Sequence, residues 1–425
     1  MTHLHTRRYT RLHEQILLSR TFSFLCGWLL TVAIPATVYW GHPFWEAKDP
    51  GRWTAITLAS VCLLMCYVSI SRTVNNYPGG QSMGLIISNV LFIYLAGALT
   101  TLFLRIELSR YMLFASTFIS INWFIAEHLL TKRYLRAKIA IIPGGMANEL
   151  IHLGEIDSRV LSAPNLAGVR YDAVVADFNG LDSTWQRFIT QCVLNGIAVY
   201  DARAMYEAIT GRVRLVRMAD NNLGALLPSR GYERLKTLLD FCMVILALPL
   251  LLPLVLITAL CIRLDSPGPI FYTQMRIGRG NQPFRIYKFR SMRTEACLQK
   301  EARFAQTDDQ RITRVGHIIR KLRIDELPQL LNVLKGEMAI IGPRPEQPEF
   351  VEQFDKTLPF YTYRHVIKPG ITGWAQVRYG YAADESDTQA KIEHDFYYIK
   401  HASIYLDIYI LLLTARTVLT GFGAR

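Results

Sequence analysis

The chain has 425 residues, of which 51% are hydrophobic, and it carries a formal net charge of +13. This length predicts two or three domains, and the apolar fraction is too high for an ordinary soluble enzyme, which favours membrane segments. The charge predicts anionic partners. Because the sequence has no nucleic-acid-binding motif, we expect lipid headgroups and phosphorylated substrates rather than nucleic acid.

Four long apolar stretches follow a polar and basic segment at residues 1–20. Each has about 20 residues, enough to cross a bilayer as a helix. Basic residues precede the first stretch and follow the fourth, so we expect both ends in the cytoplasm and a transmembrane bundle of four helices. The alternative, a buried bundle in a soluble protein, fits these lengths poorly. The stretches are residues 21–40, 53–70, 85–104 and 110–130.

A small α/β module is predicted next. Strand-like residues 137–142, 171–176 and 197–200 alternate with helix-like sequence, which indicates a parallel sheet. Gly144 and Gly145 follow the first strand, but the GxGxxG spacing of dinucleotide-binding proteins is absent. We therefore favour a structural turn in a degenerate Rossmann-like module over nucleotide binding.

Residues 241–262 form a fifth apolar stretch, which is broken by Pro249 and Pro253. A straight membrane-spanning helix tolerates such prolines only with help from its neighbours. The alternative is a re-entrant helix that bends and returns to the side it entered. We favour the re-entrant form, because the basic segments that follow would otherwise lie outside the cell.

Two strands in the turn-rich region 265–380 present basic side chains. Residues 286–293 alternate apolar and basic residues, which predicts a strand with Lys288 and Arg290 on its polar face. The strand at 339–341 runs into a rigid turn that presents Arg344. Strongly basic surface of this kind suits phosphate groups or lipid headgroups.

The C-terminal segments contain a loop, an acidic stretch and a helix. The glycine-punctuated loop 368–376, with Gly373 and Gln376, can let a ligand approach backbone amides. Residues 384–387, Asp-Glu-Ser-Asp, are predicted to be a solvated loop rather than a metal site. Residues 404–420 are short for a membrane span, and we expect a helix packed on the domain or lying in the membrane interface.

A short segment before Gly336 combines charge with a helical apolar pattern. Asp325 stands where an N-cap belongs, and Gly336 marks the end of the helix. Asp325 and Glu326 would then lie at the positive helix end, which attracts phosphate, and two adjacent acids can hold Mg²⁺. On this segment alone, a simple cap and a first-turn acid remain the alternative. The apolar face consists of Leu327, Leu330, Leu331 and Leu334.

From about Lys236 to its end, the chain resembles the bacterial sugar transferase family, the monotopic polyprenyl-phosphate phosphoglycosyl transferases. The four N-terminal stretches and the α/β module are similar to larger members that initiate exopolysaccharide repeat units. Besides the proline-broken stretch, the resemblance rests on motifs in order: Asp265-Ser266-Pro267-Gly268-Pro269, Tyr287-Lys288-Phe289-Arg290-Ser291-Met292, Asp325-Glu326-Leu327-Pro328-Gln329-Leu330, Gly342-Pro343-Arg344-Pro345 and Pro369-Gly370-Ile371-Thr372-Gly373-Trp374-Ala375-Gln376.

The resemblance implies a role for each matched residue. Asp325 is the expected nucleophile on the sugar-side phosphate of a UDP-sugar, and Asp325 with Glu326 is expected to hold Mg²⁺. Lys288 and Arg344 belong to the expected active site, and Arg320 matches an arginine five residues before the nucleophile. We also place Arg290, Gly373 and Gln376 among the residues that bind substrate or phosphate.

The sequence departs from small family members at two motifs. Leu252, rather than a serine, precedes Pro253 at the predicted bend. Val377-Arg378-Tyr379-Gly380 replaces an Asn-Gly-Arg sequence after the tryptophan–glutamine motif. Arg378 is therefore our candidate for the arginine that contacts the nucleotide.

The resemblance predicts transfer of a sugar 1-phosphate from a UDP-hexose to undecaprenyl phosphate, with release of UMP through a covalent aspartyl intermediate. This would be the first membrane step of exopolysaccharide or other glycoconjugate synthesis. The alternatives are a lipid glycosyltransferase that releases UDP, which lacks support from a well-placed DxD pattern, and a non-catalytic membrane scaffold. The identity of the sugar stays open.

We therefore predict a membrane protein of the α plus α/β class: a four-helix transmembrane bundle, a degenerate Rossmann-like module, and a mixed α/β catalytic domain anchored by a re-entrant helix. Expected partners are the UDP-sugar, polyprenyl phosphate, the bilayer, a second copy in a homodimer and downstream glycosyltransferases. We expect a bacterial inner-membrane protein with a cytoplasmic catalytic domain. The predicted divisions are 1–20, 21–131, 132–227, 228–264 and 265–425.

Overall fold

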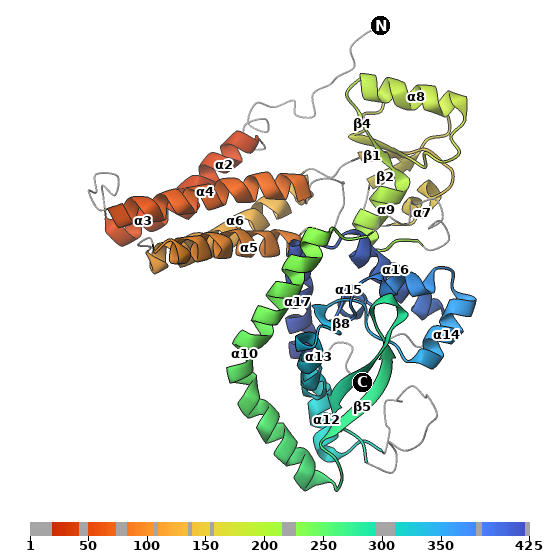
Figure 1. The fold of residues 1–425 in the computed structure, drawn as a ribbon. Coiled ribbons are helices and arrows are strands. Elements are labelled where there is room, and N and C mark those ends of the chain that lie inside the picture. The colour runs from red at the N-terminus through yellow and green to blue at the C-terminus, as the bar shows by residue number, and fades with distance from the viewer. Residues whose placement is uncertain are drawn as a thin grey trace. The chain divides into compact units, whose positions relative to one another are not determined.

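Two units make up the computed structural model, residues 1–211 and residues 212–425 (Figure 1). Most of the predicted basic N-terminus, residues 1–18, lies outside the described residues, as do residues 294–310, 380–384 and 421–425. The described ranges are 19–41, 50–73, 83–105, 109–134, 138–153, 157–214, 227–293, 311–379 and 385–420.

Long apolar helices open the N-terminal unit, as predicted. The first consists of three consecutive segments, and its middle one is a π-helix that the sequence did not signal. Together with a helix of the second unit, these helices are long and apolar enough to cross a membrane. Their bounds are α2 (Arg20–Trp28), η1 (Leu29–Ala33) and α3 (Ile34–Trp40), then α4 (Pro50–Thr73), α5 (Met83–Phe103) and α6 (Arg110–Tyr134).

These helices pack on one another through small and aromatic side chains. Leu63 of α4, Tyr94 of α5 and Phe124 of α6 are buried in one cluster. Outward-facing side chains are also apolar: Leu102 is 73% exposed and Phe114 is 76% exposed. An apolar exterior around a packed interior is the arrangement that a lipid environment favours.

Hydrogen bonds between side chains add to the packing. Ser23 Oγ of α2 donates to Glu127 Oε1 of α6 at 2.7 Å, and Trp123 Nε1 of α6 donates to the Tyr67 hydroxyl of α4 at 2.8 Å. Such bonds between helices fix their register where water is absent.

A four-stranded parallel sheet completes the N-terminal unit, in the order β2-β1-β3-β4. The three predicted strands are confirmed, and β2, a polar and partly exposed strand, was missed. Helices cover both faces, with Met205 of α9 buried on one and Phe188 of α8 on the other. The elements are β1 (Lys138–Ile141), α7 (Ala147–Ile151), β2 (Asp157–Val160), β3 (Ala173–Ala176), α8 (Ser183–Leu194), β4 (Ala198–Asp201) and α9 (Ala202–Thr210).

The glycine turn after β1 is held by a carboxylate from the end of β3. Asp177 Oδ2 accepts a hydrogen bond from the Met146 amide at 2.8 Å. A Cβ on Gly145 would lie 2.1 Å from the same oxygen, and the φ angle of Gly145 is +50°. The Asp177 carboxylate therefore takes the backbone donor that a phosphate would need, which agrees with a structural turn rather than a dinucleotide site.

The second unit begins with α10 (Arg230–Asp265), a single 36-residue helix that contains both Pro249 and Pro253. The helix bends in its middle, as Figure 1 shows. Internal prolines remove backbone hydrogen bonds and are a common cause of such bends.

Both ends of α10 pack on the remainder of this unit. Near its start, Lys236 Nζ lies 3.0 Å from Asp407 Oδ2, and near its end Ile262 is buried beside Phe289. The middle is apolar and exposed, with Leu250 81% exposed. A bent helix with both ends on one domain is compatible with a re-entrant helix, which stays a prediction.

The remaining elements form two small sheets and the helices around them. β5 pairs with β6 in antiparallel register, and β7 pairs with β8 in parallel register. The elements are β5 (Phe271–Ile277), η5 (Arg279–Asn281), β6 (Pro283–Phe289), α12 (Arg314–Lys321), η6 (Ile324–Gln329), α13 (Leu330–Leu334), β7 (Ala339–Ile341), α14 (Pro348–Thr357), η7 (Tyr361–Val366), β8 (Gly370–Thr372), α15 (Trp374–Arg378), α16 (Glu385–Lys400) and α17 (Ile404–Thr420).

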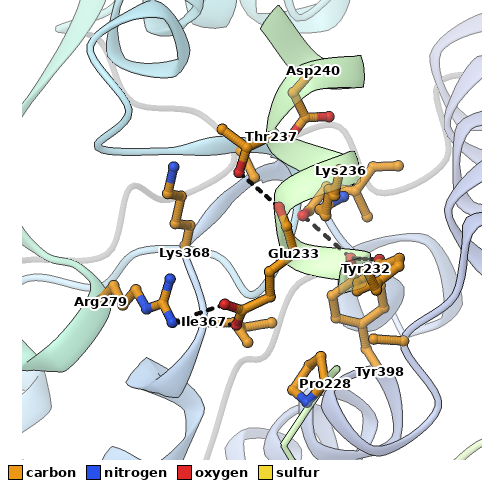
Figure 2. A pocket seen from close by; sticks show the side chains of 13 residues that line it. Pro228, Tyr232, Glu233, Lys236, Thr237, Asp240, Arg279, Ile367, Lys368 and Tyr398 are labelled. Atoms are coloured by element: carbon orange, nitrogen blue, oxygen red, sulfur yellow. Dashed lines mark hydrogen bonds and ion pairs between the residues drawn. The ribbon is translucent and has the colours of Figure 1, made fainter. Parts of the chain in front are cut away.

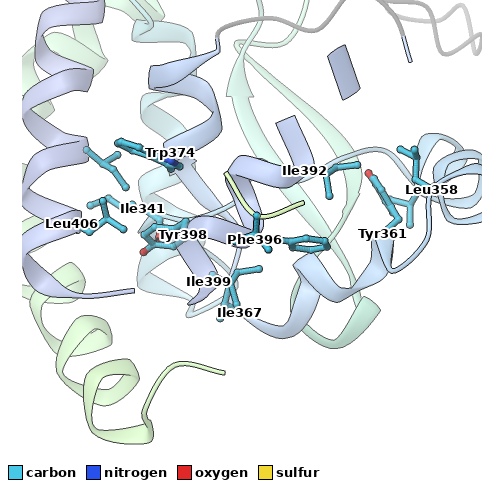
Figure 3. Close-up of a cluster of buried hydrophobic side chains, with 13 residues drawn as sticks. Ile341, Leu358, Tyr361, Ile367, Trp374, Ile392, Phe396, Tyr398, Ile399 and Leu406 are labelled. Atoms are coloured by element: carbon cyan, nitrogen blue, oxygen red, sulfur yellow. Dashed lines mark hydrogen bonds between the residues drawn. The ribbon is translucent and has the colours of Figure 1, made fainter. Parts of the chain in front are cut away.

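Buried aromatic side chains form much of the core in the C-terminal part of this unit. Tyr361, Phe396 and Tyr398 are almost fully buried, with Trp374 in the same cluster (Figure 3). α17 contributes Ile410 to this core, so the predicted C-terminal helix packs on the domain.

Three local predictions were wrong. Asp325 is not an N-cap, because Arg323 occupies the position before η6 and has a left-handed φ of +58°. Leu331 does not share a buried leucine face, since it is 48% exposed. Of the predicted loop 384–387, residue 384 lies outside the described residues, and residues 385–387 are not a loop, because they form the first turn of α16.

Candidate active site

The acidic pair lies in a tight turn between two short helices. Asp325 and Glu326 belong to η6, a 3₁₀-helix that leads directly into α13. The left-handed conformation of Arg323 ends α12 abruptly and redirects the chain. Gly336, at a φ of +78°, then follows the end of α13, so the predicted glycine stop is confirmed.

Three cations from separate segments surround the Glu326 carboxylate. Lys288 Nζ of β6 lies 3.1 Å from Glu326 Oε1, Arg344 Nη2 lies 2.9 Å from it, and Arg323 Nη1 lies 3.9 Å from it. Burial by itself would raise the pKa of Glu326, but Arg344, Lys288 and Arg323 outweigh it and hold that pKa well below its usual range. Glu326 is therefore ionised and fixed in place.

Asp325 is in a different electrostatic state. Burial raises the pKa of its carboxyl, and the negative charge of Glu326 raises it further, while the nearby cations oppose this rise. Asp325 Oδ1 is buried and has no hydrogen-bond partner among the described residues. On the preceding helix, Arg320 Nη1 is also buried without a partner among those residues. A buried acceptor and a buried donor that lack partners among the described residues are candidates for binding a ligand, an ion or water.

Closely packed glycines place Arg344 at this site. The turn after β7 contacts the turn after β8 backbone to backbone, and the Gly342 amide donates to the Thr372 carbonyl at 2.9 Å. A Cβ on Gly373 would lie 2.2 Å from the Gly342 carbonyl oxygen, and one on Gly370 would lie 2.0 Å from the Gly342 nitrogen. Gly373, predicted as a substrate contact, thus has a packing role that fixes the position of Arg344.

Arg290 holds a turn. It is buried, and its guanidinium donates to the Pro267 carbonyl at 2.8 Å and to the Ser266 carbonyl and hydroxyl at 2.6 and 2.9 Å. These bonds correct the sequence-based picture of Arg290 as part of an exposed polar face. The structure shows an arginine that stabilises the turn after α10.

Gln376 and Arg378 contact groups other than the acidic pair. No contact among the described residues joins either of them to Asp325 or Glu326. The Arg378 guanidinium lies over the Trp374 ring at 5.4 Å, and Gln376 Nε2 donates to the Ile371 carbonyl at 3.5 Å. Their predicted contact with the nucleotide stays a prediction.

A small cavity of about 40 Å³ lies beside the first turns of α10 (Figure 2). Its lining includes Glu233, Arg279 and Lys368, but no residue of the predicted site. Arg279 and Glu233 form an ion pair at 3.0 Å, as the dashed line in Figure 2 shows. The ion pair of Arg279 with Glu233 suits an anchor for α10 better than a reaction site.

A relative of almost full length decides the identity of the chain. The UDP-N-acetylgalactosamine-undecaprenyl-phosphate N-acetylgalactosaminephosphotransferase of Aeromonas hydrophila is 47% identical over 423 residues, which is 99% of this chain and 99% of the relative. The chain belongs to the bacterial sugar transferase family. The sequence model of that family matches residues 231–421, which contain every residue of the candidate site.

Other members of the bacterial sugar transferase family match less than half of this chain. The UDP-glucose:undecaprenyl-phosphate glucose-1-phosphate transferase of Xanthomonas campestris pv. campestris is 42% identical over 187 residues, 43% of this chain and 38% of the relative. The enzyme of the same name from Escherichia coli (strain K12) is 40% identical over 200 residues, 46% of this chain and 42% of the relative. The chain is therefore an undecaprenyl-phosphate sugar phosphotransferase.

The sequence did not reveal the buried charges behind Arg344 in this transferase. Arg364 Nη2 donates to the Arg344 carbonyl at 2.9 Å and to Asp395 Oδ2 at 2.7 Å. Lys391 Nζ lies 2.6 Å from Glu346 Oε1, two residues beyond Arg344. The available signal was weak, since only charged residues within an aromatic-rich stretch mark these positions.

Proposed function

We propose that the enzyme transfers a sugar 1-phosphate from a UDP-sugar to polyprenyl phosphate and releases UMP. One observation carries the proposal: a buried Asp325 oxygen without a partner among the described residues belongs to the residue next to Glu326, which three cations hold in its ionised form. Attack of a carboxylate on a phosphate brings two anions together, so it needs cations close to the acidic pair.

The reaction proceeds in two displacements at one phosphorus atom. A carboxylate oxygen of Asp325 forms a bond to the sugar-side phosphorus, and the bond from that phosphorus to the bridging oxygen breaks, so UMP leaves with the electron pair. A phosphate oxygen of the polyprenyl phosphate then forms a bond to the same phosphorus. The acyl-phosphate bond breaks, and Asp325 is regenerated as a carboxylate.

The surrounding cations divide into two groups. Arg344 and Lys288 hold Glu326 and present the rest of their charge to the phosphates; arginine can bind phosphate bidentately, whereas lysine acts as a point charge. Arg320 has a buried N–H without a partner in the described part of the chain, so it is the candidate phosphate ligand on the helix before the acidic pair.

The residues present fit Mg²⁺ through Asp325 in particular. Mg²⁺ binds through one or two carboxylates together with substrate phosphates. Asp325 offers an oxygen that no described residue contacts by a hydrogen bond, whereas Glu326 Oε1 already accepts from Arg344 and Lys288. When bound, the metal neutralises phosphate charge. We propose Asp325 as the main metal ligand and Glu326 as a supporting one.

The relatives suggest which donor to test first. The Aeromonas hydrophila relative, which matches both units, is named for UDP-N-acetylgalactosamine. The relatives named for UDP-glucose match 43% and 46% of this chain. We propose an N-acetylhexosamine donor, with N-acetylgalactosamine first.

The apolar helices and the positive net charge suggest where in the cell the enzyme acts. We propose a bacterial inner-membrane enzyme with a cytoplasmic catalytic unit, in which α10 is re-entrant and holds the site at the headgroup layer. A homodimer and contacts with downstream glycosyltransferases remain predictions.

A donor panel tests the proposal. Purified enzyme in nanodiscs with Mg²⁺ and undecaprenyl phosphate should release UMP from UDP-N-acetylgalactosamine, and Asp325→Asn should abolish this release. Unchanged turnover by that variant would remove Asp325 as the nucleophile. Release of UDP would show direct glycosyl transfer, and no release from any UDP-sugar would favour the scaffold alternative.

A further inference from the structure

The free edge of β6 is satisfied by a side chain. β6 pairs with β5 along one edge, and an unpaired opposite edge presents backbone N–H and C=O groups that need partners. Asn332 Oδ1 accepts from the Tyr287 amide at 3.2 Å, and Asn332 Nδ2 donates to the Arg285 carbonyl at 2.8 Å. The Asn332 side chain thus makes the hydrogen bonds to β6 that a neighbouring strand would make.

Asn332 has its hydrogen-bonding capacity filled. It is fully buried, and Nδ2 also donates to Glu337 Oε2 at 2.7 Å. Its backbone carbonyl accepts from the amides of Glu337 and Met338 at 3.0 and 3.2 Å. Only an amide has one acceptor and two donors in this arrangement, since a carboxylate lacks the donors and an aliphatic side chain lacks both.

The position of Asn332 in the chain gives these bonds a consequence for the site. Asn332 lies in α13, the helix that continues from the turn carrying Asp325 and Glu326. Tyr287 immediately precedes Lys288, whose ammonium lies 3.1 Å from Glu326. The amide therefore connects the strand that carries the lysine to the helix that carries the acidic pair.

We propose that Asn332 is a positioning residue for phosphosugar transfer, because it fixes the distance between Lys288 and the acidic pair. The inference rests on the proposed function for its effect on rate, but the hydrogen bonds can be tested independently. A displacement of about 1 Å at a reacting site can lower the rate about 100-fold.

The neighbouring residue supplies a matched control. Val333 is buried in the cluster that includes Phe284 and Ile286 of β6, so Val333→Ala leaves a cavity against the same strand without removing either bond. Asn332→Ala removes both bonds. Asn332→Asp keeps an acceptor for the Tyr287 amide but loses the donor to the Arg285 carbonyl.

Steady-state kinetics of the full-length variants in nanodiscs form the first test. We expect Asn332→Ala to lower kcat about 100-fold, with little change in KM for the UDP-sugar. Val333→Ala should keep a kcat near that of the parent enzyme while lowering the melting temperature. Asn332→Asp should not recover the parent kcat, because it loses both Nδ2 donors and places a carboxylate beside Glu337. If both alanine variants lose kcat in proportion to their loss of stability, Asn332 has only a packing role and the proposal is overturned.

Amide exchange at Tyr287 forms the second test, and it needs no substrate. The Tyr287 amide should exchange faster in Asn332→Ala than in Val333→Ala, because only the first variant removes its acceptor. Equal exchange rates would overturn the proposal whatever the activities are. If the parent enzyme releases no UMP, the proposed function fails, whereas this comparison still decides whether Asn332 holds the strand.

Discussion

Replacing Glu326 by glutamine tests the charge balance of the site directly. Glu326→Gln keeps the size of the side chain and removes its charge. Lys288 and Arg344, which lie 3.1 and 2.9 Å from Glu326 Oε1, would then face a neutral amide. Since the side chains of both cations are about a fifth exposed, water compensates for part of the loss.

The contacts give the expected magnitude. A hydrogen bond to a charged group contributes about 1.5–3 kcal/mol, and removing one partner of a buried ion pair costs about 3–5 kcal/mol. Partial rehydration of the cations places the expected loss at the lower end, about 3 kcal/mol. For a unit of about 200 residues, that loss corresponds to a fall in Tm of about 6–12 °C.

Thermal unfolding of full-length variants in detergent measures this fall, and Glu352→Gln provides the control. Glu352 and Lys356 form an ion pair at 2.8 Å, but their side chains are 74% and 71% exposed. An exposed pair of this kind is screened by water and contributes little to stability. Equal melting temperatures for Glu326→Gln and Glu352→Gln would refute the conclusion that a buried cluster of charges holds the site.

The same variant has a second consequence that is read from the pH dependence of UMP release. Burial raises the pKa of Asp325, and the charge of Glu326 raises it further. Removing that charge should lower the pKa of Asp325, so the acid limb of the rate profile should move to lower pH even though the maximal rate falls. A shift of the limb to higher pH would contradict this reasoning.

Two further predictions concern residues around the site. Gly373→Ala would place a methyl group 2.2 Å from the Gly342 carbonyl, so we expect a stability loss of about 1–3 kcal/mol and slower UMP release through displacement of Arg344. Gly231→Ala, at a position with open space, should leave both melting temperature and rate nearly unchanged. Burial lowers the pKa of His365 to about 3, as does the adjacent Arg364 charge, so its folded pKa lies below the unfolded value of 6.5. Stability from the neutral ring is then present above pH 6.5 and falls as the pH drops, by about 2 kcal/mol at pH 5, and His365→Gln should flatten the melting-temperature profile between pH 7 and 5.

Features set by local sequence were predicted well. The C-terminal helix was expected at residues 404–420 and is found at Ile404–Thr420, because a largely apolar stretch determines its limits. The strand patterns of the N-terminal module were also clear, since β3 is buried along its whole length. The strands β2 and β5 were missed because their side chains are polar or alternate in exposure, so no apolar run marks them.

The conformation at the acidic pair could not be read from the local sequence. An acid before a proline fits the helix-start pattern, but Glu326 contacts residues 38 and 18 positions away in the chain. Those contacts form because the 3₁₀ turn that begins after Arg323 places the Glu326 carboxylate in a buried position. Tertiary partners therefore override the capping preference of Asp325.

Arg290 and Arg344 show why residue type and motif could not separate support from catalysis. Each follows a strand, and each belongs to a motif that pointed to phosphate. In the folded unit, Arg290 donates to the carbonyls of a turn, whereas Arg344 donates to the ionised Glu326. A carbonyl partner leaves the arginine fixed in a structural contact, while a carboxylate partner places its charge beside the group that meets the substrate. The partner at the end of the side chain, and not its place in a motif, determines which arginine takes part in the proposed reaction.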